Sequence, residues 1–229
     1  MTLPAAPELS LERTRDGSFT LLANALDEPY HSRHGALQES MHVFIRQGLL
    51  AHSGRDLDVL EVGLGTGLNM LLTWLQVIEG RKEVRYLALE PRPLDRDMLR
   101  SLDHPAQCGL PVLQEPFLDL MTGPEEEAIG TAVPFRFTRS RQGMEELDAE
   151  QAFDVIYHDA FGPRVQPDLW TDAIFQRSFR ALRPGGHLVT YCAKGEVRRA
   201  MQRAGFRVQR LPGPPGKREM LRATRPATP

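Results

Sequence analysis

The segment from Val59 to Asn69, VLEVGLGTGLN, restricts the possible folds of this 229-residue chain more than any other part of it. A short apolar run leads into three glycines at alternate positions, and an apolar helical pattern follows. This predicts a buried strand, a tight turn and a helix. Glycines let the backbone approach a ligand closely, and the free N–H groups of a helix N-terminus favour a carboxylate or a phosphate. The segment therefore predicts a ligand-binding turn in an α/β sheet.

Strand-like and helical patterns alternate along most of the sequence, which is typical of parallel βαβ units. We expect strands at 57–62, 84–90, 134–138, 153–157 and 187–193, and helices at 36–50, 68–78, 172–182 and 196–204. Region 91–131 is expected to hold one helix and an irregular connection. Two last strands, 206–210 and 218–223, have a short connection and must be antiparallel. The predicted fold class is α/β: a doubly wound, Rossmann-like sheet of the class I methyltransferase type, mostly parallel with a C-terminal antiparallel hairpin, plus an N-terminal extension.

Length and composition fit one domain preceded by this extension. With 41% apolar and 25% charged residues, the chain has the composition of a globular protein. We expect residues 56–229 to form the methyltransferase-type domain and residues 1–55 to pack on it. The longest strongly apolar stretch, 70–78, is far shorter than the ~20 residues of a membrane span, and the N-terminus lacks a signal pattern. We expect a cytoplasmic protein with no membrane partner. Cys108 and Cys192 lack zinc-type spacing, so no metal is expected.

The glycine spacing and two acidic residues indicate which ligand the turn binds. In a dinucleotide-binding turn the third glycine would stand at position 68, where this chain has Leu68, so a pyrophosphate is disfavoured. Glu90 ends the second strand and can accept both ribose hydroxyls, while Glu61 can face an ammonium group directly or through water. These features predict S-adenosylmethionine as cosubstrate. The candidate binding residues in these segments are Glu61, Gly63, Gly65, Thr66, Gly67, Asn69 and Glu90.

A second group of residues surrounds Asp159, within FDVIYHDAFGP. The fourth strand delivers Asp159 to the carboxyl edge of the sheet, where open α/β folds bind their ligands. Asp159 is therefore a candidate for catalysis and for cosubstrate binding. Each acid also has a structural interpretation. Asp159 can be a turn former, Glu61 a buried acid paired with a helix N-terminus, and Glu90 a solvated strand end.

Charge is distributed unevenly along the chain. The net charge is −2, yet residues 194–225 contain ten basic residues and only two acidic ones, Glu196 and Glu219. Such an excess indicates a surface for an anionic partner, and a solvated helix face is the structural alternative.

Several segments together resemble the MnmC family of tRNA wobble-uridine modification proteins, and most closely its stand-alone methyltransferase form, MnmD. The matching segments span most of the chain. They are YHS at 30–32, GALQES at 35–40, the turn at 61–69, LE at 89–90 with PL at 93–94, HDAF at 158–161, QPDLWT at 166–171 and KREM at 217–220.

The resemblance implies transfer of a methyl group from S-adenosylmethionine to the 5-aminomethyl group of a tRNA wobble uridine, often 2-thiolated, to give 5-methylaminomethyluridine. Bifunctional members add an FAD-dependent domain, for which this chain is too short, so no FAD is expected. The resemblance aligns Asp159 with the active-site aspartate, and Tyr30 and Glu39 are further candidates on the substrate side, with packing of the N-terminal helix as their alternative. The implied partner is tRNA, and the residues expected to hold its phosphates are Arg198, Arg199, Lys217 and Arg218.

One segment departs from the usual pattern of this fold. Methyltransferases often carry an acid after the third strand that accepts the adenine amino group, but this chain has Gly143 there. Gln142 or a backbone carbonyl is the expected substitute.

Three other functions remain open at this point. A small-molecule amine transferase, such as an aminopropyltransferase or a polyamine methyltransferase, shares the predicted fold but has no use for the basic segment. A non-catalytic RNA-binding module and a nicotinamide oxidoreductase are the others. The oligomeric state, the tRNAs modified and any need for 2-thiolation are not predicted.

Overall fold

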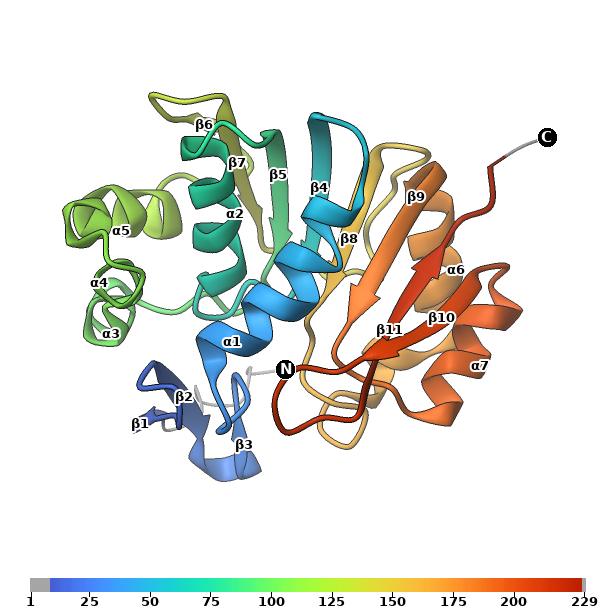
Figure 1. The fold of residues 1–229 in the computed structure, drawn as a ribbon, viewed down its shortest axis with the longest axis horizontal. Coiled ribbons are helices and arrows are strands. Elements are labelled where there is room, and N and C mark those ends of the chain that lie inside the picture. Colours follow the sequence, from blue (N-terminus) through green and yellow to red (C-terminus); the bar gives the residue numbers. More distant parts are fainter. Residues whose placement is uncertain (1–8, 228–229) are drawn as a thin grey trace.

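The strand β4 (Asp56–Val62) lies in the middle of an eight-stranded sheet and carries the glycine turn at its carboxyl end (Figure 1). The structure is a computed structural model that describes residues 9–227. Residues 1–8 of the expected extension and 228–229 of the expected methyltransferase-type domain lie outside the described residues. The strand order is β10-β11-β9-β8-β4-β5-β7-β6.

Five central strands run parallel. They are β7 (Phe135–Ser140), β5 (Glu83–Leu89), β4, β8 (Phe153–His158) and β9 (Leu182–Thr190). From β4 the chain first builds the sheet on one side, through β5, and later on the other side, through β8. The carboxyl end of β4 is therefore the point where the strand order reverses, which is where doubly wound sheets bind ligands.

Antiparallel strands complete both edges of the sheet. β11 (Glu219–Thr224) pairs with β9, and β10 (Arg207–Pro212) pairs with β11. The last strand of the chain, β11, therefore lies between β9 and the edge strand β10. At the other edge β6 (Ile129–Gly130) pairs with β7. The predicted α/β class with its C-terminal hairpin is confirmed.

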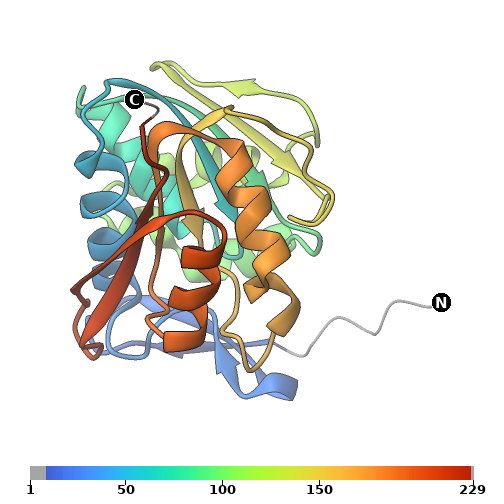
Figure 2. The same ribbon diagram turned by 90° about the vertical axis from the view of Figure 1, so that its right-hand side faces the viewer.

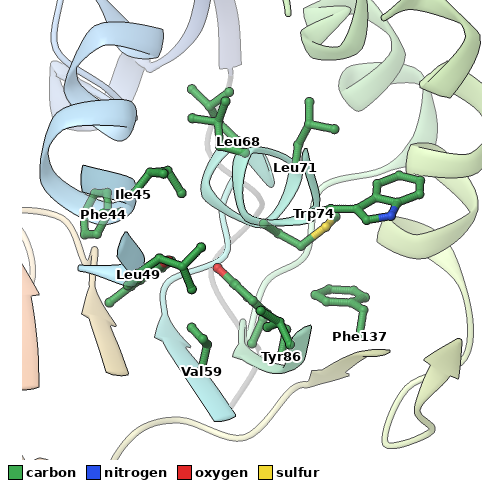
Figure 3. Packing of buried hydrophobic residues seen from close by; sticks show 14 of the residues in the cluster. Phe44, Ile45, Leu49, Val59, Leu68, Leu71, Trp74, Tyr86 and Phe137 are labelled. Atoms are coloured by element: carbon green, nitrogen blue, oxygen red, sulfur yellow. The ribbon is translucent and has the colours of Figure 1, made fainter. Parts of the chain in front are cut away.

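Helices cover both faces of the sheet, as Figure 2 shows. The helices α1 (Ala36–Ser40) and α2 (Leu68–Ile78) pack on one face, and α6 (Asp172–Ala181) and α7 (Gly195–Arg203) on the other. Successive β4 side chains alternate between these layers: Val59 lies in the first core, with Phe44 and Leu71 (Figure 3), and Leu60 lies in the second. Glu61 must therefore point toward α2.

The N-terminal region contains a small sheet that the sequence did not predict. Its strands β1 (Leu9–Arg13), β2 (Phe19–Ala23) and β3 (Glu28–Pro29) are antiparallel, and the sheet lies below α1 in Figure 1, near the carboxyl edge of the large sheet. The helix expected at 36–50 is irregular, because α1 continues as a π-helical segment at Met41–Arg46.

Other differences concern the ends and number of helices. Region 91–131 holds three helices rather than one: α3 (Arg96–Leu102), α4 (His104–Gln107) and α5 (Gln114–Thr122). The helix α6 ends at Ala181, and β9 begins directly after it, with a register shift that accommodates Pro184 and its two following glycines. Short 3-10 turns occur at Asn24–Leu26, Leu49–Ala51, Pro111–Leu113 and Pro167–Trp170.

Candidate active site

Glu61 is the innermost acid of the candidate site. Its side chain is fully buried, and the Tyr86 hydroxyl donates a 2.8 Å hydrogen bond to Oε2 while Nδ2 of Asn69 donates one of 2.9 Å to Oε1. Burial, with a smaller contribution from the charge of Glu90, raises the pKa of Glu61 to about 8, against the lowering effect of the two donors. The arrangement holds a carboxylate that lacks a cationic partner among the described residues, which suits a ligand ammonium group.

The glycine turn connects Glu61 to α2 and touches two other parts of the site. Gly63 and Gly65 both have positive φ values, +88° and +50°, which favour glycine. A Cβ on Gly63 would lie 2.9 Å from the carbonyl oxygen of Asp159, and one on Gly65 would lie 3.0 Å from the Tyr30 ring. A Cβ on Gly67 would overlap Met121. The turn therefore has no room for side chains at these positions.

Thr66, another predicted turn residue, directs its side chain into the interior. Its hydroxyl lies 3.0 Å from Nε2 of His104 and 3.5 Å from Nε2 of His31, and all three side chains are buried. Burial lowers the pKa of His31 to about 4 and that of His104 to about 3, so both imidazoles are neutral at pH 7. These two histidines support the turn from the interior, a role that no motif in the sequence indicates.

Glu90 follows β5 immediately and reaches the turn. Its Oε2 accepts a 2.9 Å hydrogen bond from the backbone N–H of Gly65, and its Oε1 accepts one of 3.0 Å from the N–H of Arg92. Burial raises its pKa. The structure thus places Glu90 beside the turn, as a ribose-binding role requires.

Asp159 follows β8 and lies on the other side of the turn. Its backbone N–H bonds to the carbonyl of Val62 at 3.0 Å, and its Oδ2 accepts a 2.7 Å hydrogen bond from Nδ2 of Asn69. Burial, followed by the negative charges of Glu61 and Glu39, raises the pKa of Asp159 well above its ordinary value. Unlike Glu61, this side chain retains partial exposure. It can therefore meet a ligand from outside.

Tyr30 comes from the N-terminal region and packs against the turn. Its ring makes an edge contact with Phe161, with centroids 4.9 Å apart, beside Gly65. Burial, helped by the charge of Glu90, raises its pKa to about 12, so the phenol stays protonated. Phe161, two residues after Asp159, thus lines the site beside Tyr30, a position that its place in the HDAF segment alone does not indicate.

Glu39 and Lys217 form an ion pair at the same edge, although they are 178 positions apart. Glu39 is 5% exposed, and it also accepts a 2.8 Å hydrogen bond from the N–H of Ser32. The ammonium of Lys217 lies 3.9 Å from the centroid of the Tyr191 ring, a cation–π geometry, and the Tyr191 hydroxyl bonds to the carbonyl of Ala160. Lys217, expected as a phosphate contact, is thus bound to an acid of the site.

The remaining basic candidates lie outside this cluster. Arg198 and Arg199 are on α7 and are half-buried and exposed, respectively, while Arg218 is exposed beside Lys217. None of the three takes part in a salt bridge within residues 9–227. Arg203, on the same helix, is paired with Asp172 at 2.6 Å.

Gln142 lies just beyond the end of β7. Ser140, which ends that strand, accepts a 2.8 Å hydrogen bond from the N–H of Glu90 at its carbonyl and one of 3.1 Å from the N–H of Gln142 at its hydroxyl. Gln142 is half-buried there. The structure thus brings it to the same edge as Glu90.

Two negative findings apply to the described part of the chain. Among residues 9–227, no group of three or more histidine, cysteine, aspartate or glutamate side chains is arranged to hold a metal ion. None of the helices in that range has the length and apolar character needed to cross a membrane.

Comparison with known sequences identifies relatives of this site and fold. Residues 126–226 match the profile of a family described as S-adenosyl-L-methionine-dependent methyltransferase. Over 211 residues the chain is 32% identical to the tRNA 5-methylaminomethyl-2-thiouridine biosynthesis bifunctional protein MnmC of Ralstonia nicotianae. The aligned region covers 87% of this chain and 32% of that protein. The chain spans about a third of the length of the curated relatives it matches.

Solved structures share the fold at lower sequence identity. The crystal structure of MnmC2 from Aquifex aeolicus superposes with a TM-score of 0.74 at 24% identity, covering 98% of this chain and 72% of that one. Spermidine synthase from Thermotoga maritima gives a TM-score of 0.58 at 13% identity, covering 94% and 68%.

Residues 126–226 are thus similar to S-adenosyl-L-methionine-dependent methyltransferases, and the fold of the chain is shared with MnmC2. The sequence is also similar, over most of its length, to about one third of the MnmC protein, which confirms the resemblance found in the motifs.

Proposed function

We propose that this methyltransferase transfers a methyl group from S-adenosylmethionine to the 5-aminomethyl group of a tRNA wobble uridine, with or without 2-thiolation, to give the 5-methylaminomethyl product. The observation that carries the proposal is the hydrogen-bonded series Glu61, Asn69 and Asp159 beside the glycine turn. It presents a fully buried carboxylate next to a partly exposed one. Two carboxylates at different depths suit a cationic cosubstrate inside and an amine substrate outside.

The cosubstrate is assigned to the turn and the strand ends around it. Glu90 would accept the ribose hydroxyls, and Glu61 would face the methionine ammonium group. The backbone of Gly63 and Gly65 would allow close approach, and Gln142 would border the adenine. S-adenosylmethionine supplies an electrophilic methyl group on a positively charged sulfur.

Asp159 is assigned to the transfer itself. It would accept a hydrogen bond from the substrate amine and orient the nitrogen lone pair toward the methyl carbon. As the N–C bond forms, the C–S bond breaks and its electrons remain on sulfur, while the surplus amine proton passes to Asp159 directly or through water. Positioning supplies most of the catalysis in such a displacement. Burial and the neighbouring acids raise the pKa of Asp159, which makes its carboxylate a stronger base toward the amine proton.

The charges around the site favour a cationic cosubstrate. Glu61, Glu90, Asp159 and Glu39 approach one another, while Lys217 pairs with Glu39 and the charges of Arg92 and Arg139 act on Glu90. The sulfonium and the ammonium group of S-adenosylmethionine would relieve the repulsion between these carboxylates. Tyr30 and Glu39 would shape the substrate side.

The tRNA is assigned to the exposed basic residues near the same edge. Arg198, Arg199 and Arg218 have no acidic partner in the described chain and can contact phosphates. Lys217 would contribute its charge from within the site. A tRNA substrate also implies a cytoplasmic location.

A small-molecule amine is the second candidate substrate, because the fold is shared with a spermidine synthase. The deciding experiment incubates the protein with labelled S-adenosylmethionine and either undermodified tRNA carrying aminomethyluridine or a set of polyamines. Nucleoside mass spectrometry should detect methylaminomethyluridine only with the tRNA. Methylated polyamine with unmodified tRNA, or aminopropylated polyamine when decarboxylated S-adenosylmethionine is the donor, would instead support the second candidate. Binding of tRNA without turnover would indicate an RNA-binding module, and binding of NAD in place of the cosubstrate an oxidoreductase.

A further inference from the structure

Asn69 stands between the two carboxylates of the site. Its side-chain nitrogen donates a 2.9 Å hydrogen bond to Oε1 of Glu61 and a 2.7 Å hydrogen bond to Oδ2 of Asp159. An amide group has two N–H bonds, so both are used. The side chain is 2% exposed, and its Oδ1 has no hydrogen-bond partner within residues 9–227.

The position of Asn69 is costly unless it serves the site. Asparagine is a weak helix former, and a buried amide oxygen without a partner is unfavourable. Asn69 nevertheless occupies the second position of α2, between Leu68 and Met70, which are both buried core residues. Its hydrogen-bond partners are Glu61, which lies in β4, and Asp159, which directly follows β8, so its side chain joins β4 to the end of β8.

We propose that Asn69 is the positioning residue of the transfer reaction: it holds the carboxylates of Glu61 and Asp159 apart and directs Asp159 toward the substrate amine. The inference rests on the function proposed for Asp159 and adds a residue that acts through it. Two carboxylates that accept hydrogen bonds from the same nitrogen lie close enough to share one proton. Such sharing would turn Asp159 toward Glu61 and prevent it from accepting the proton of the amine. The two N–H groups of Asn69 oppose this because each stabilises a charged carboxylate.

The test compares three variants with the wild-type protein. Asn69→Leu keeps the approximate size and removes both donors, and Asn69→Ser keeps one donor. Thr73→Val is the matched control, because Thr73 lies one turn later on α2 and bonds to the Tyr157 hydroxyl rather than to either acid. Single-turnover methylation of undermodified tRNA is measured from pH 6 to 9.5 at saturating S-adenosylmethionine.

The proposal predicts a rate loss together with a change in the pH profile. Asn69→Leu should be slower by about 10–10³-fold, and the acidic limb of its profile should move to higher pH by about 1 unit, because the donors that favour charged Asp159 are gone. The rate and the pH profile of Asn69→Ser should lie between those of Asn69→Leu and the wild type. Thr73→Val should match the wild type in both the rate and the pH profile. A wild-type rate and profile for Asn69→Leu, with weaker cosubstrate binding alone, would overturn the proposal.

A measurement on the wild-type protein covers the case in which Asn69→Leu does not fold. In nuclear magnetic resonance spectra, both side-chain amide protons of Asn69 should shift with pH as the carboxylates titrate. If one or neither proton responds, Asn69 does not join the two acids and the proposal fails. Absence of tRNA methylation by the wild-type protein would instead contradict the proposed function, and the spectra would still test the joint hydrogen bonding.

Discussion

Oε2 of Glu90 accepts a hydrogen bond of 2.9 Å from the backbone N–H of Gly65, which ties the end of β5 to the middle of the glycine turn. The residue assigned to the ribose and the turn assigned to the methionine end are therefore held in one unit. The geometry of the cosubstrate site is fixed by the folded chain itself, so small changes in the turn should have measurable effects on binding.

Replacing Gly65 by alanine should weaken S-adenosylmethionine binding by at least about tenfold. The new Cβ would lie 3.0 Å from the Tyr30 ring and push it away from the turn. Gly80→Ala is the control, because Gly80 also has a positive φ, +69°, but has nothing within 4 Å of its Cβ position. Both variants should lose about 1–2 kcal/mol of stability from backbone strain. Calorimetry measures the affinity for S-adenosylmethionine, and thermal unfolding measures the loss of stability separately. Equal affinities for the two variants would contradict the assignment of the cosubstrate to the glycine turn.

S-adenosylmethionine affinity should rise as the pH increases through about 8. Burial raises the pKa of Glu61 to about 8, and the acid must lose its proton to face an ammonium group. Stability of the free protein should change in the opposite direction. Between the unfolded value of 4.5 and about 8, the folded state holds a proton that the unfolded state has lost, so stability falls as the pH rises. Glu61→Gln should flatten both dependences, as measured by calorimetry and by denaturant unfolding at a series of pH values.

Asp159→Asn should lower single-turnover methylation by about 10²–10⁴-fold while leaving S-adenosylmethionine affinity nearly intact. The amide keeps the size of the side chain and one acceptor oxygen but cannot take the amine proton. Undermodified tRNA carrying the aminomethyl group is the substrate, compared at equal bound cosubstrate. A rate within a few fold of wild type would make Asp159 a turn residue and direct attention to Tyr30 or Glu39.

Replacing Arg198 and Arg199 together by alanine should weaken tRNA binding and flatten its salt dependence. Each lost phosphate contact lowers the slope of log affinity against log salt by roughly 0.7–0.9. Arg203→Ala is the control on the same helix, because Arg203 is already paired with Asp172 and should contribute less. If the slope of the double variant equals that of the wild type, α7 presents only a solvated face.

Local patterns predicted the parts of the fold that depend on neighbouring residues. The turn at 61–69 and the strand ends at Glu90 and Asp159 lie in continuous segments, and parallel strands bring their carboxyl ends to one edge, so these acids could be expected near one another. The hairpin of β10 and β11 followed from its short connection. The identification of these elements needed no long-range information.

The remaining features depend on contacts between distant segments. The ion pair of Glu39 and Lys217 forms because the loop before β11 returns to α1, which no local pattern indicates. The small N-terminal sheet has strands of five, five and two residues, too short for a clear alternation of apolar and polar positions. The hydrogen bond from Tyr86 to Glu61 depends on the register between the adjacent strands β4 and β5. No local pattern indicates that register, so the sequence did not predict this bond.

The antiparallel direction of β11 determines where the described chain leaves the molecule. Because β11 runs opposite to β9, its last residue, Thr224, lies at the amino edge of the sheet, and Figure 1 shows the chain continuing from there away from the glycine turn. A biotin or a fluorescent label attached at residues 225–227 would therefore sit at the end of the molecule remote from Asp159. Protein immobilised in this way would turn its catalytic edge toward the solution, where a molecule as large as a tRNA could reach it unhindered by the support.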